Sequence, residues 1–201
     1  RLSSRCGVRG RPLLLAIQVD AGTGGEGIIH QACSLTAEQI RDECGEQLET
    51  GTRVLWDAGQ ERVMAWQEER IGAVVLARRQ ANPSAAESVP LLLSLVRTAG
   101  LDILGWDSAA RQLQGRVGLL GLAFPEEGWP CLEDERLRAD LEEWLAPCLW
   151  GVRSRRDLAA VDIGAALRTL LSREQLRLLE ERAPTHITVP SGHRVEIDYR
   201  P

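Results

Sequence analysis

The spacing of apolar residues changes twice along this chain, and that change limits the folds it can adopt. Up to about residue 80 the apolar residues form short strand-like runs, whereas from residue 84 to 182 they recur at helical spacing. After Ala183 they alternate with polar residues again, as in a strand with one buried face. The sequence therefore predicts an α+β protein in which a helical segment separates two β regions.

The second β region is predicted to be a hairpin. Residues 194–199 alternate between polar and apolar side chains, residues 187–189 do the same, and the turn-forming run Pro190-Ser191-Gly192 lies between them. An isolated two-stranded hairpin is marginally stable in water. We therefore expect this hairpin to pair with the sheet formed by the first β region.

The first β region is predicted to contain five strands and one short helix. Thr36 and Gln39 form a capping box that opens the helix, which runs to about Cys44. The expected strands are residues 12–21, 27–35, 52–57, 61–67 and 71–78. Short strands joined by tight turns favour a small antiparallel β-barrel of the oligonucleotide-binding type, with a β-sandwich as the alternative.

These patterns give three segments. Residues 1–80 form part of the barrel, residues 81–183 are an inserted all-helical segment, and residues 184–201 are the returning hairpin that closes the barrel. A glycine-rich run at residues 22–27 matches G-x-G-x-x-G, but β-branched residues follow it instead of a helix. We interpret this run as a hairpin turn and not as a dinucleotide site.

The composition excludes several kinds of catalytic site. All 24 basic residues are arginine, so neither a phosphate-binding P-loop nor a Schiff-base lysine can form. The three histidines lack companion ligands at metal-binding spacing, so we expect no metal site. The five cysteines are scattered and include no C-x-x-C pair, which favours reduced thiols in a cytoplasmic protein.

The termini, hydropathy and charge add three further expectations. The chain begins with Arg1 and enters strand-like sequence at once, which suggests a fragment. No apolar run approaches the ~20 residues of a membrane span. The net charge of −5 is unusual for a nucleic-acid-binding protein, so any contact with phosphates must be local. The arginine clusters at 78–79 and 153–156 are candidates for such contacts, with salt bridges at element ends as the alternative.

Several motifs, spread over nearly the whole chain, resemble the C-terminal region of the bacterial HrpB-type ATP-dependent helicases, which belong to the DEAH-box family. The most specific is Ala183-Pro184-Thr185-His186-x-Thr188-Val189-Pro190-Ser191-Gly192, followed by Asp198-Tyr199. The runs at 144–147, 151–154, 165–168 and 106–113 fit the same region, as do Trp56-Asp57 and residues 70–76.

The resemblance implies a function that the composition alone does not indicate. In that family two ATPase domains precede this region, so ATP and Mg²⁺ would act in the parent protein and no cofactor is expected in this chain. The expected partners are single-stranded nucleic acid, RNA rather than DNA, and the helicase core domains of the same polypeptide. The expected function is an accessory module that binds or guides the single strand. The alternative is a module for protein interaction or structural bracing.

The residues expected to contact nucleic acid lie at the barrel edge and on the hairpin. They are Arg78, Arg79, Thr185, His186, Ser191 and Arg194. Arg194 follows the turn on the polar face of its strand, so its guanidinium is expected to reach a phosphate while Val195 stays buried. Ser191 and the backbone N–H of Gly192 are expected to add neutral donors. Glu196 and Asp198 project from the same face as Arg194 and would repel a strand laid along it.

We predict that the isolated chain does not hydrolyse ATP. It contains no lysine to hold the phosphates and no DEAH motif to hold Mg²⁺. The measurement is phosphate release by the purified chain with and without single-stranded RNA. RNA-stimulated turnover by a preparation free of contaminating ATPases would contradict the prediction.

Overall fold

The structure, a computed structural model, describes residues 1–20 and 27–200. The chain divides into two compact units: residues 1–53 with 66–81, and residues 54–65 with 82–201. Strands β3 (Leu48–Asp57) and β4 (Arg62–Ile71) contribute residues to both units. Within the described residues, no helix has the length and hydropathy needed to cross a membrane.

The first unit contains the predicted short strands and the short helix. Strands β1 (Leu14–Asp20) and β2 (Ile28–Ser34) form an antiparallel pair, and β3, β4 and β5 (Val74–Ala81) form a second sheet in that order. Helix α1 (Ala37–Cys44) begins at the predicted capping box and is followed by the 3-10 turn η1 (Gly45–Gln47). The turn predicted at residues 22–27 falls almost wholly outside the described residues.

The predicted closed barrel is not observed. The described strands form three separate sheets, of two, three and two strands. Among the described strands, β1 and β2 pair only with each other, although Ile29 of β2 also forms a parallel bridge with Leu2. Along the chain, α1 and η1 separate these two strands from β3. Leu15, Ile17 and Val19 of β1 remain more than half exposed. Tight turns along the sequence thus specify neighbouring strand pairs, and they do not specify closure between those pairs.

The second unit is built mainly from helices. The long helices are α2 (Ala85–Ala99), α3 (Ser108–Ala123) and α8 (Arg173–Arg182). The shorter elements are η2 (Leu101–Ile103), η3 (Pro125–Glu127), α4 (Asp134–Ala139), α5 (Leu141–Trp144), η4 (Ala146–Leu149), α6 (Arg155–Ala159) and α7 (Ile163–Arg168). The predicted helical stripes form one core, whose members include the fully buried Leu92, Leu113, Leu141, Trp144 and Leu167.

The ends of β3 and β4 belong to this helical unit. Val63 is buried in the helical core, and Val54 and Trp56 pack against that core. The backbone N–H of Val63 donates to the carbonyl oxygen of Arg153 at 2.7 Å, and the N–H of Arg155 donates to that of Glu61 at 2.9 Å. Residues 153–155 therefore continue the β3–β4 hairpin by one short antiparallel bridge.

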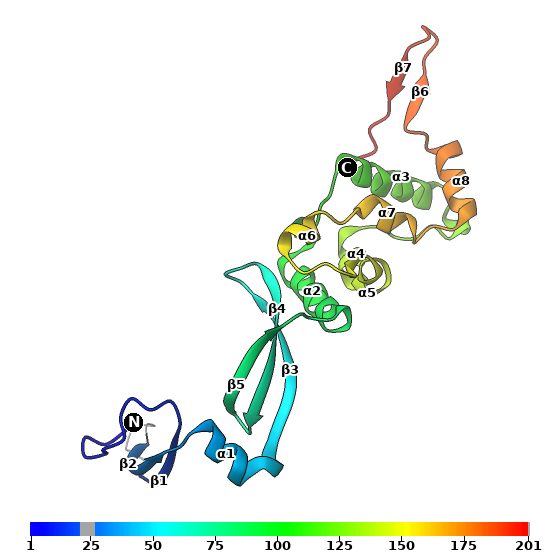
Figure 1. Ribbon diagram of the computed structural model, residues 1–201. Coiled ribbons are helices and arrows are strands. Elements are labelled where there is room, and N and C mark those ends of the chain that lie inside the picture. Colours follow the sequence, from blue (N-terminus) through cyan, green and yellow to red (C-terminus); the bar gives the residue numbers. More distant parts are fainter. Residues whose placement is uncertain (21–26, 201) are drawn as a thin grey trace. The chain divides into compact units, whose positions relative to one another are not determined.

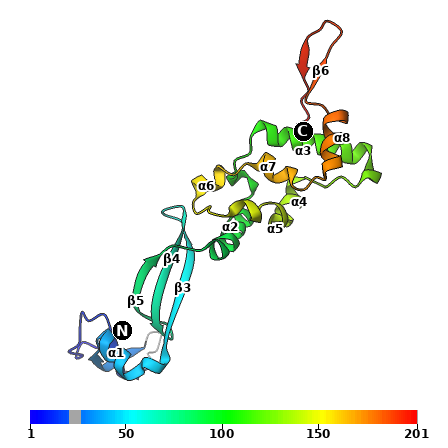
Figure 2. The ribbon, with the colours of Figure 1, turned by 45° about the vertical axis from the view of Figure 1, so that its right-hand side comes forward.

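The C-terminal hairpin consists of β6 (His186–Thr188) and β7 (Arg194–Glu196), which pair only with each other. Figure 1 and Figure 2 show it projecting from the helical unit near α3 and α8. The prediction that this hairpin returns to the N-terminal sheet is therefore wrong. The alternation of polar and apolar residues predicted the hairpin itself. It carries no information about which distant surface holds the hairpin.

Helix α3 is the surface that holds both ends of the hairpin. Before β6, the guanidinium of the buried Arg116 donates to the carbonyl oxygens of Ala183 (2.6 Å) and Leu179 (3.1 Å) at the end of α8. After β7, the side-chain amide of Gln112 donates to the carbonyl oxygen of Ile197 and accepts from the N–H of Tyr199. The Tyr199 hydroxyl then donates to the carbonyl oxygen of Pro184, which joins the two ends.

We predict that Arg116→Met destabilises the chain by about 3 kcal/mol, because it leaves buried helix-end carbonyls without donors. The measurement is urea unfolding followed by far-UV circular dichroism. The matched control is Arg177→Met, since Arg177 is exposed and its ion pairs with described residues are those with Glu174 and Glu181 on its own helix. Equal midpoints for the two variants would contradict a special role for Arg116.

Candidate nucleic-acid interface

Arg78 and Arg79 lie on opposite faces of β5 and do not act as one cluster. The guanidinium of Arg78 stacks on the ring of Trp66 in β4, 4.5 Å from the ring centroid. The guanidinium of Arg79 donates to the side-chain oxygen of Gln67 at 2.8 Å. Successive residues of a strand point to opposite faces. Trp66 and Gln67 therefore lie on opposite faces of the sheet, and the guanidinium group that contacts each of them lies on the same face as its partner. Sequence reasoning treated the pair as a single contact, although alternation alone was sufficient to separate them.

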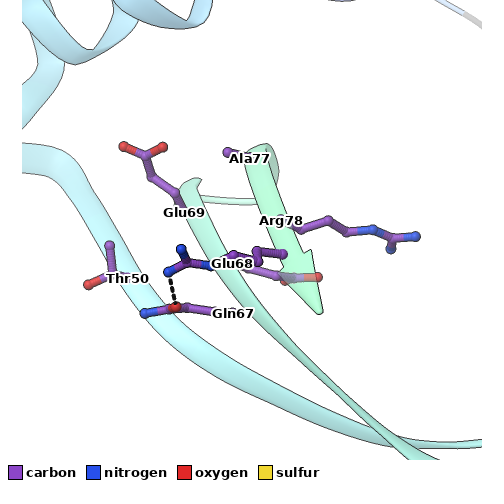
Figure 3. A pocket seen from close by; sticks show the side chains of 7 residues that line it. Thr50, Gln67, Glu68, Glu69, Ala77 and Arg78 are labelled. Atoms are coloured by element: carbon purple, nitrogen blue, oxygen red, sulfur yellow. Dashed lines mark hydrogen bonds between the residues drawn. The ribbon is translucent and has the colours of Figure 1, made fainter. Parts of the chain in front are cut away.

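The two arginines border a shallow pocket of about 370 Å³ in the first unit. In Figure 3 the Arg78 side chain extends away from those of Gln67 and Glu69, while the dashed line joins Gln67 to Arg79. Thr50 of β3 and Ala77 of β5 complete the lining together with Glu68. The pocket is therefore an opening at the sheet surface with both acidic and basic groups around it.

The acidic residues of this pocket differ in how they are compensated. Glu69 accepts a two-pronged ion pair from Arg41 of α1, with a shortest N···O distance of 2.6 Å. The hydrogen bond from Arg41 lowers the pKa of the Glu69 carboxyl. Glu68 is buried, and its Oε2 atom has no hydrogen-bond partner among the described residues. Strand alternation puts Glu68 on the Trp66 face and Glu69 on the Gln67 face, so the acidic residues do not decide between the two arginines. Arg78 is the better candidate for a phosphate contact because it is stacked on Trp66, whereas Arg79 is already hydrogen-bonded to Gln67.

The predicted hairpin residues lie together at and around β6 and β7. Thr188 faces Arg194 across the pair, and His186 faces Glu196. Directly opposed residues share one face of a sheet, so these four side chains form the polar face of the hairpin. The Nδ1 atom of His186 also lies 3.1 Å from the hydroxyl of Thr185. Arg194 is exposed, and no ion pair joins it to another described residue.

The tip of the hairpin corrects one part of the predicted contact. Gly192 adopts a positive φ of 83°, as the turn requires, and its N–H donates to the carbonyl oxygen of Val189 at 2.8 Å. That N–H is therefore not free to bind a phosphate, contrary to the prediction. Ser191 is exposed at the turn, where its hydroxyl remains a candidate donor.

The opposite face of the hairpin corrects a second part. Ile187 and Val195 face each other across the strands and are 46% and 45% exposed. The alternation of polar and apolar residues predicted that Val195 would be buried in the core. This prediction is wrong. The hairpin has one polar face and one apolar face, and helices of its own unit cover neither.

Asp198, predicted to repel a nucleic-acid strand, is compensated by its neighbour Arg200. The Arg200 guanidinium donates to both carboxylate oxygens, at 2.8 and 2.7 Å. This hydrogen bonding lowers the pKa of Asp198 to about 2. The Gln112 amide donates to the same carboxylate at 3.1 Å. The negative charge at the root of the hairpin is therefore balanced locally, which leaves Glu196 as the acidic residue of the polar face.

The predicted site residues thus form two surfaces and not one. Arg78 and Arg79 belong to the first unit, whereas Thr185, His186, Ser191 and Arg194 belong to the second. Sequence reasoning missed the Trp66 ring that orients Arg78 and the Arg200 side chain that compensates Asp198. The described residues contain no group of three or more acidic, histidine or cysteine side chains placed to hold a metal ion.

Two family comparisons match separate parts of the chain. Residues 144–201 match the family described as ATP-dependent helicase C-terminal. Residues 47–81 match the family described as ATP-dependent RNA helicase HrpB, connector region. The second match covers the whole three-stranded sheet β3-β4-β5, and the first covers the segment from the last residue of α5 through the hairpin.

Comparisons with whole proteins agree with these matches. The chain is 36% identical over 163 residues to the ATP-dependent RNA helicase HrpB of Escherichia coli K12, which is 81% of the chain but 20% of that protein. It is similar to the crystal structures of the E. coli DExH-box NTPase HrpB and of the E. coli DEAH/RHA helicase HrpB, with a TM-score of 0.58 in each case. The identities are 33% and 32%, and the similarity covers 93% of the chain but only 23% and 24% of those structures.

We predict that Arg200→Gln raises the pKa of Asp198 from about 2 toward the ordinary value near 4. A carboxyl whose folded pKa is lowered adds stability above its unfolded pKa, and that stability is lost as pH falls toward the folded pKa. The unmodified chain therefore loses this contribution between about pH 4 and pH 2, whereas the variant lacks it at every pH above about 4. The measurement is an NMR titration of the Asp198 carboxyl carbon.

The control within the same titration is Glu87, whose pKa is lowered by the Ser84 hydroxyl, far from Arg200 in the sequence. Its midpoint should not change in the Arg200→Gln variant. An Asp198 midpoint that also stays unchanged would contradict the role given to Arg200.

Proposed function

Because the chain belongs to the HrpB-type helicases and corresponds to their connector and C-terminal regions, we propose that it helps an ATP-dependent DEAH-box helicase to bind or guide single-stranded RNA. The observation that carries this proposal is Arg194. It lies exposed on the polar face of a projecting hairpin, and no described residue forms an ion pair with it. An arginine so placed is available to a phosphate.

The hairpin contact is expected to involve a small set of donors. Arg194 supplies the charge, Ser191 and Thr188 supply neutral hydroxyl donors, and His186 lies on the same face. Thr185 acts through His186, since their side chains are hydrogen-bonded. Because Arg200 compensates Asp198, repulsion of the RNA backbone comes mainly from Glu196. The contact is therefore strongest at the turn end of the hairpin.

A separate contact is proposed at Arg78 in the first unit. Stacking on Trp66 holds the guanidinium in one orientation while its N–H groups remain free to donate at the edge of the plane. Arg79 contributes less, since one of its N–H groups is already bonded to Gln67. Both surfaces bind the backbone and not the base edges, so we expect little sequence preference.

ATP binding and hydrolysis are assigned to other parts of the proposed parent protein. The chain has no lysine, so its residues do not fit the phosphates of ATP and Mg²⁺, and no step of the ATPase reaction is derived from them. The helicase core domains are the proposed partners within the same polypeptide, and the proposed location is the cytoplasm. The function of this chain is then to position RNA for a core that lies elsewhere.

A specific observation favours protein interaction as a second candidate function. Ile187 and Val195 form an exposed apolar pair on the hairpin face opposite Arg194. Exposed apolar surface on a projecting element is typical of a protein contact. A hairpin that braces the helicase core through this face would need no contact between Arg194 and RNA.

We predict weak RNA binding that depends on salt, with a slope of about −1 to −2 for log affinity against log salt concentration. Arg194→Ala is expected to weaken binding several-fold and to reduce the slope by about 1, because one phosphate contact is lost. Arg78→Ala should have a smaller effect of the same kind. The measurement is fluorescence anisotropy of a labelled single-stranded RNA across a salt series.

The matched control is Arg177→Ala, which removes an exposed arginine already paired with Glu174 and Glu181. It should bind RNA as the unmodified chain does. Equal affinity of the unmodified chain and Arg194→Ala, or binding that does not change with salt, would reject the RNA contact and support the protein-interaction candidate.

A further inference from the structure

Trp150 projects from the helical unit on a tight turn. It is 76% exposed, whereas the other five tryptophans are buried or half-buried. The N–H of Val152 donates to the carbonyl oxygen of Leu149 at 3.1 Å, and Gly151 supplies the positive φ of 85° that the third position of such a turn requires. Leu149 and Val152 are buried in the helical core. The core therefore fixes both ends of the turn, and the indole ring is held at the surface.

The ring of Trp150 is not used within the described part of the chain. Guanidinium groups stack on three other aromatic rings, those of Trp66, Trp106 and Phe124. No described arginine stacks on Trp150, and no described residue accepts a hydrogen bond from its indole N–H. An exposed aromatic ring is a stacking platform for any nucleobase, because every base has a π-face.

A hollow of about 440 Å³ lies beside this ring. Most of its lining is apolar and comes from α2 and η4, including Pro90 and Pro147. Glu142 also lines it, but its carboxylate is paired with Arg97 at 2.7 Å. The hollow therefore has room for a planar base against the indole ring, and its acidic group is already compensated.

Two arginines without ion pairs follow the turn. Arg153 and Arg156 lie three and six residues after Trp150, and no described residue forms an ion pair or a hydrogen bond with either guanidinium. Arg156 is exposed and Arg153 is half-buried. Three residues of chain span at most about 11 Å. A base stacked on Trp150 and the phosphate beside it therefore fall within reach of the Arg153 side chain.

The neighbouring charges leave an excess of positive charge at this place. Arg62 is exposed and faces Ser154 across the short antiparallel bridge. Arg155 has a long ion pair with Glu61, at 3.7 Å. Residues 61–62 and 153–157 thus hold four arginines against two carboxylates, those of Glu61 and Asp157, in a chain whose net charge is −5. This local surface is complementary to a phosphate backbone.

We propose that Trp150, Arg153 and Arg156 form a further contact for single-stranded RNA, in which one base stacks on the indole ring and the adjacent phosphates bind the two guanidinium groups. The proposal rests on the proposed function for the identity of the nucleic acid. It adds a contact with a base, which neither Arg78 nor Arg194 provides. Stacking tolerates every base, so this contact increases affinity without a sequence preference.

The test compares the unmodified 201-residue chain with its Trp150→Leu variant on two labelled probes, by fluorescence anisotropy. One probe is a single-stranded oligouridine, and the other is a ribose-phosphate strand of the same length without bases. Trp150→Leu should bind oligouridine about tenfold more weakly, because one stacked base is lost. It should bind the strand without bases as the unmodified chain does, and its salt slope should not change. Trp150→Phe keeps an aromatic ring and should retain most of the affinity.

A second variant and a matched control separate charge from stacking. Arg156→Gln should weaken binding of both probes and reduce the salt slope by about 1, because a phosphate contact is lost on either strand. The control is Leu122→Ala, which removes another highly exposed apolar side chain, 86% exposed, outside the proposed contact. It should bind both probes as the unmodified chain does.

Three results would overturn the proposal. They are equal affinity of the unmodified chain and Trp150→Leu for oligouridine, an equal loss on both probes, and no binding of oligouridine by the unmodified chain. If the first result is found while Arg194→Ala still weakens binding, the hairpin contact stands and the Trp150 contact fails. If Trp150→Leu weakens binding of oligouridine alone and Arg194→Ala has no effect, the Trp150 contact stands and the hairpin contact fails.

Discussion

Three neighbouring residues of α3 determine where the C-terminal hairpin stands. Arg116 binds the carbonyl oxygens at the end of α8, Gln112 binds the backbone that leaves β7, and Gly115 lets that backbone lie against the helix. A guanidinium buried to this extent is stable only when its donors are used, and here two main-chain carbonyls and Glu180 accept from it. The hairpin's position therefore depends on a polar network within the helical unit.

This anchoring explains how a short hairpin with two exposed faces persists. Two strands of three residues bury too little apolar area to be stable alone. The hydrogen bond from Tyr199 to Pro184 closes the base of the hairpin, which reduces the conformational freedom of residues 185–198 between them. The tip remains free of packing, so its polar residues are accessible to a ligand.

The sequence predicted local structure well and long-range pairing poorly. The capping boxes at Thr36 and Ser172, the helical stripes and the β6–β7 hairpin are all present, since each depends on residues close in sequence. The described strands do not form the closed barrel, and the hairpin is held by α3. Alternation of polar and apolar residues identifies the apolar face of a strand, but it does not identify the distant segment that packs against that face. Arg78 and Arg79 show the same limit at the site. Their opposite faces follow from strand geometry, but the Trp66 ring under Arg78 is contributed by another strand.

The charge pattern around the hairpin limits what it can bind. The protein as a whole carries a net charge of −5, so long-range attraction for RNA is weak, and most arginines of the helical unit are paired within it. Arg200 compensates Asp198 at the root, so the field at the tip is set mainly by Arg194 against Glu196. With only one unpaired positive charge on that face, specific affinity cannot come from the hairpin alone. In the proposed function the hairpin therefore orients a single strand and does not supply the affinity by itself.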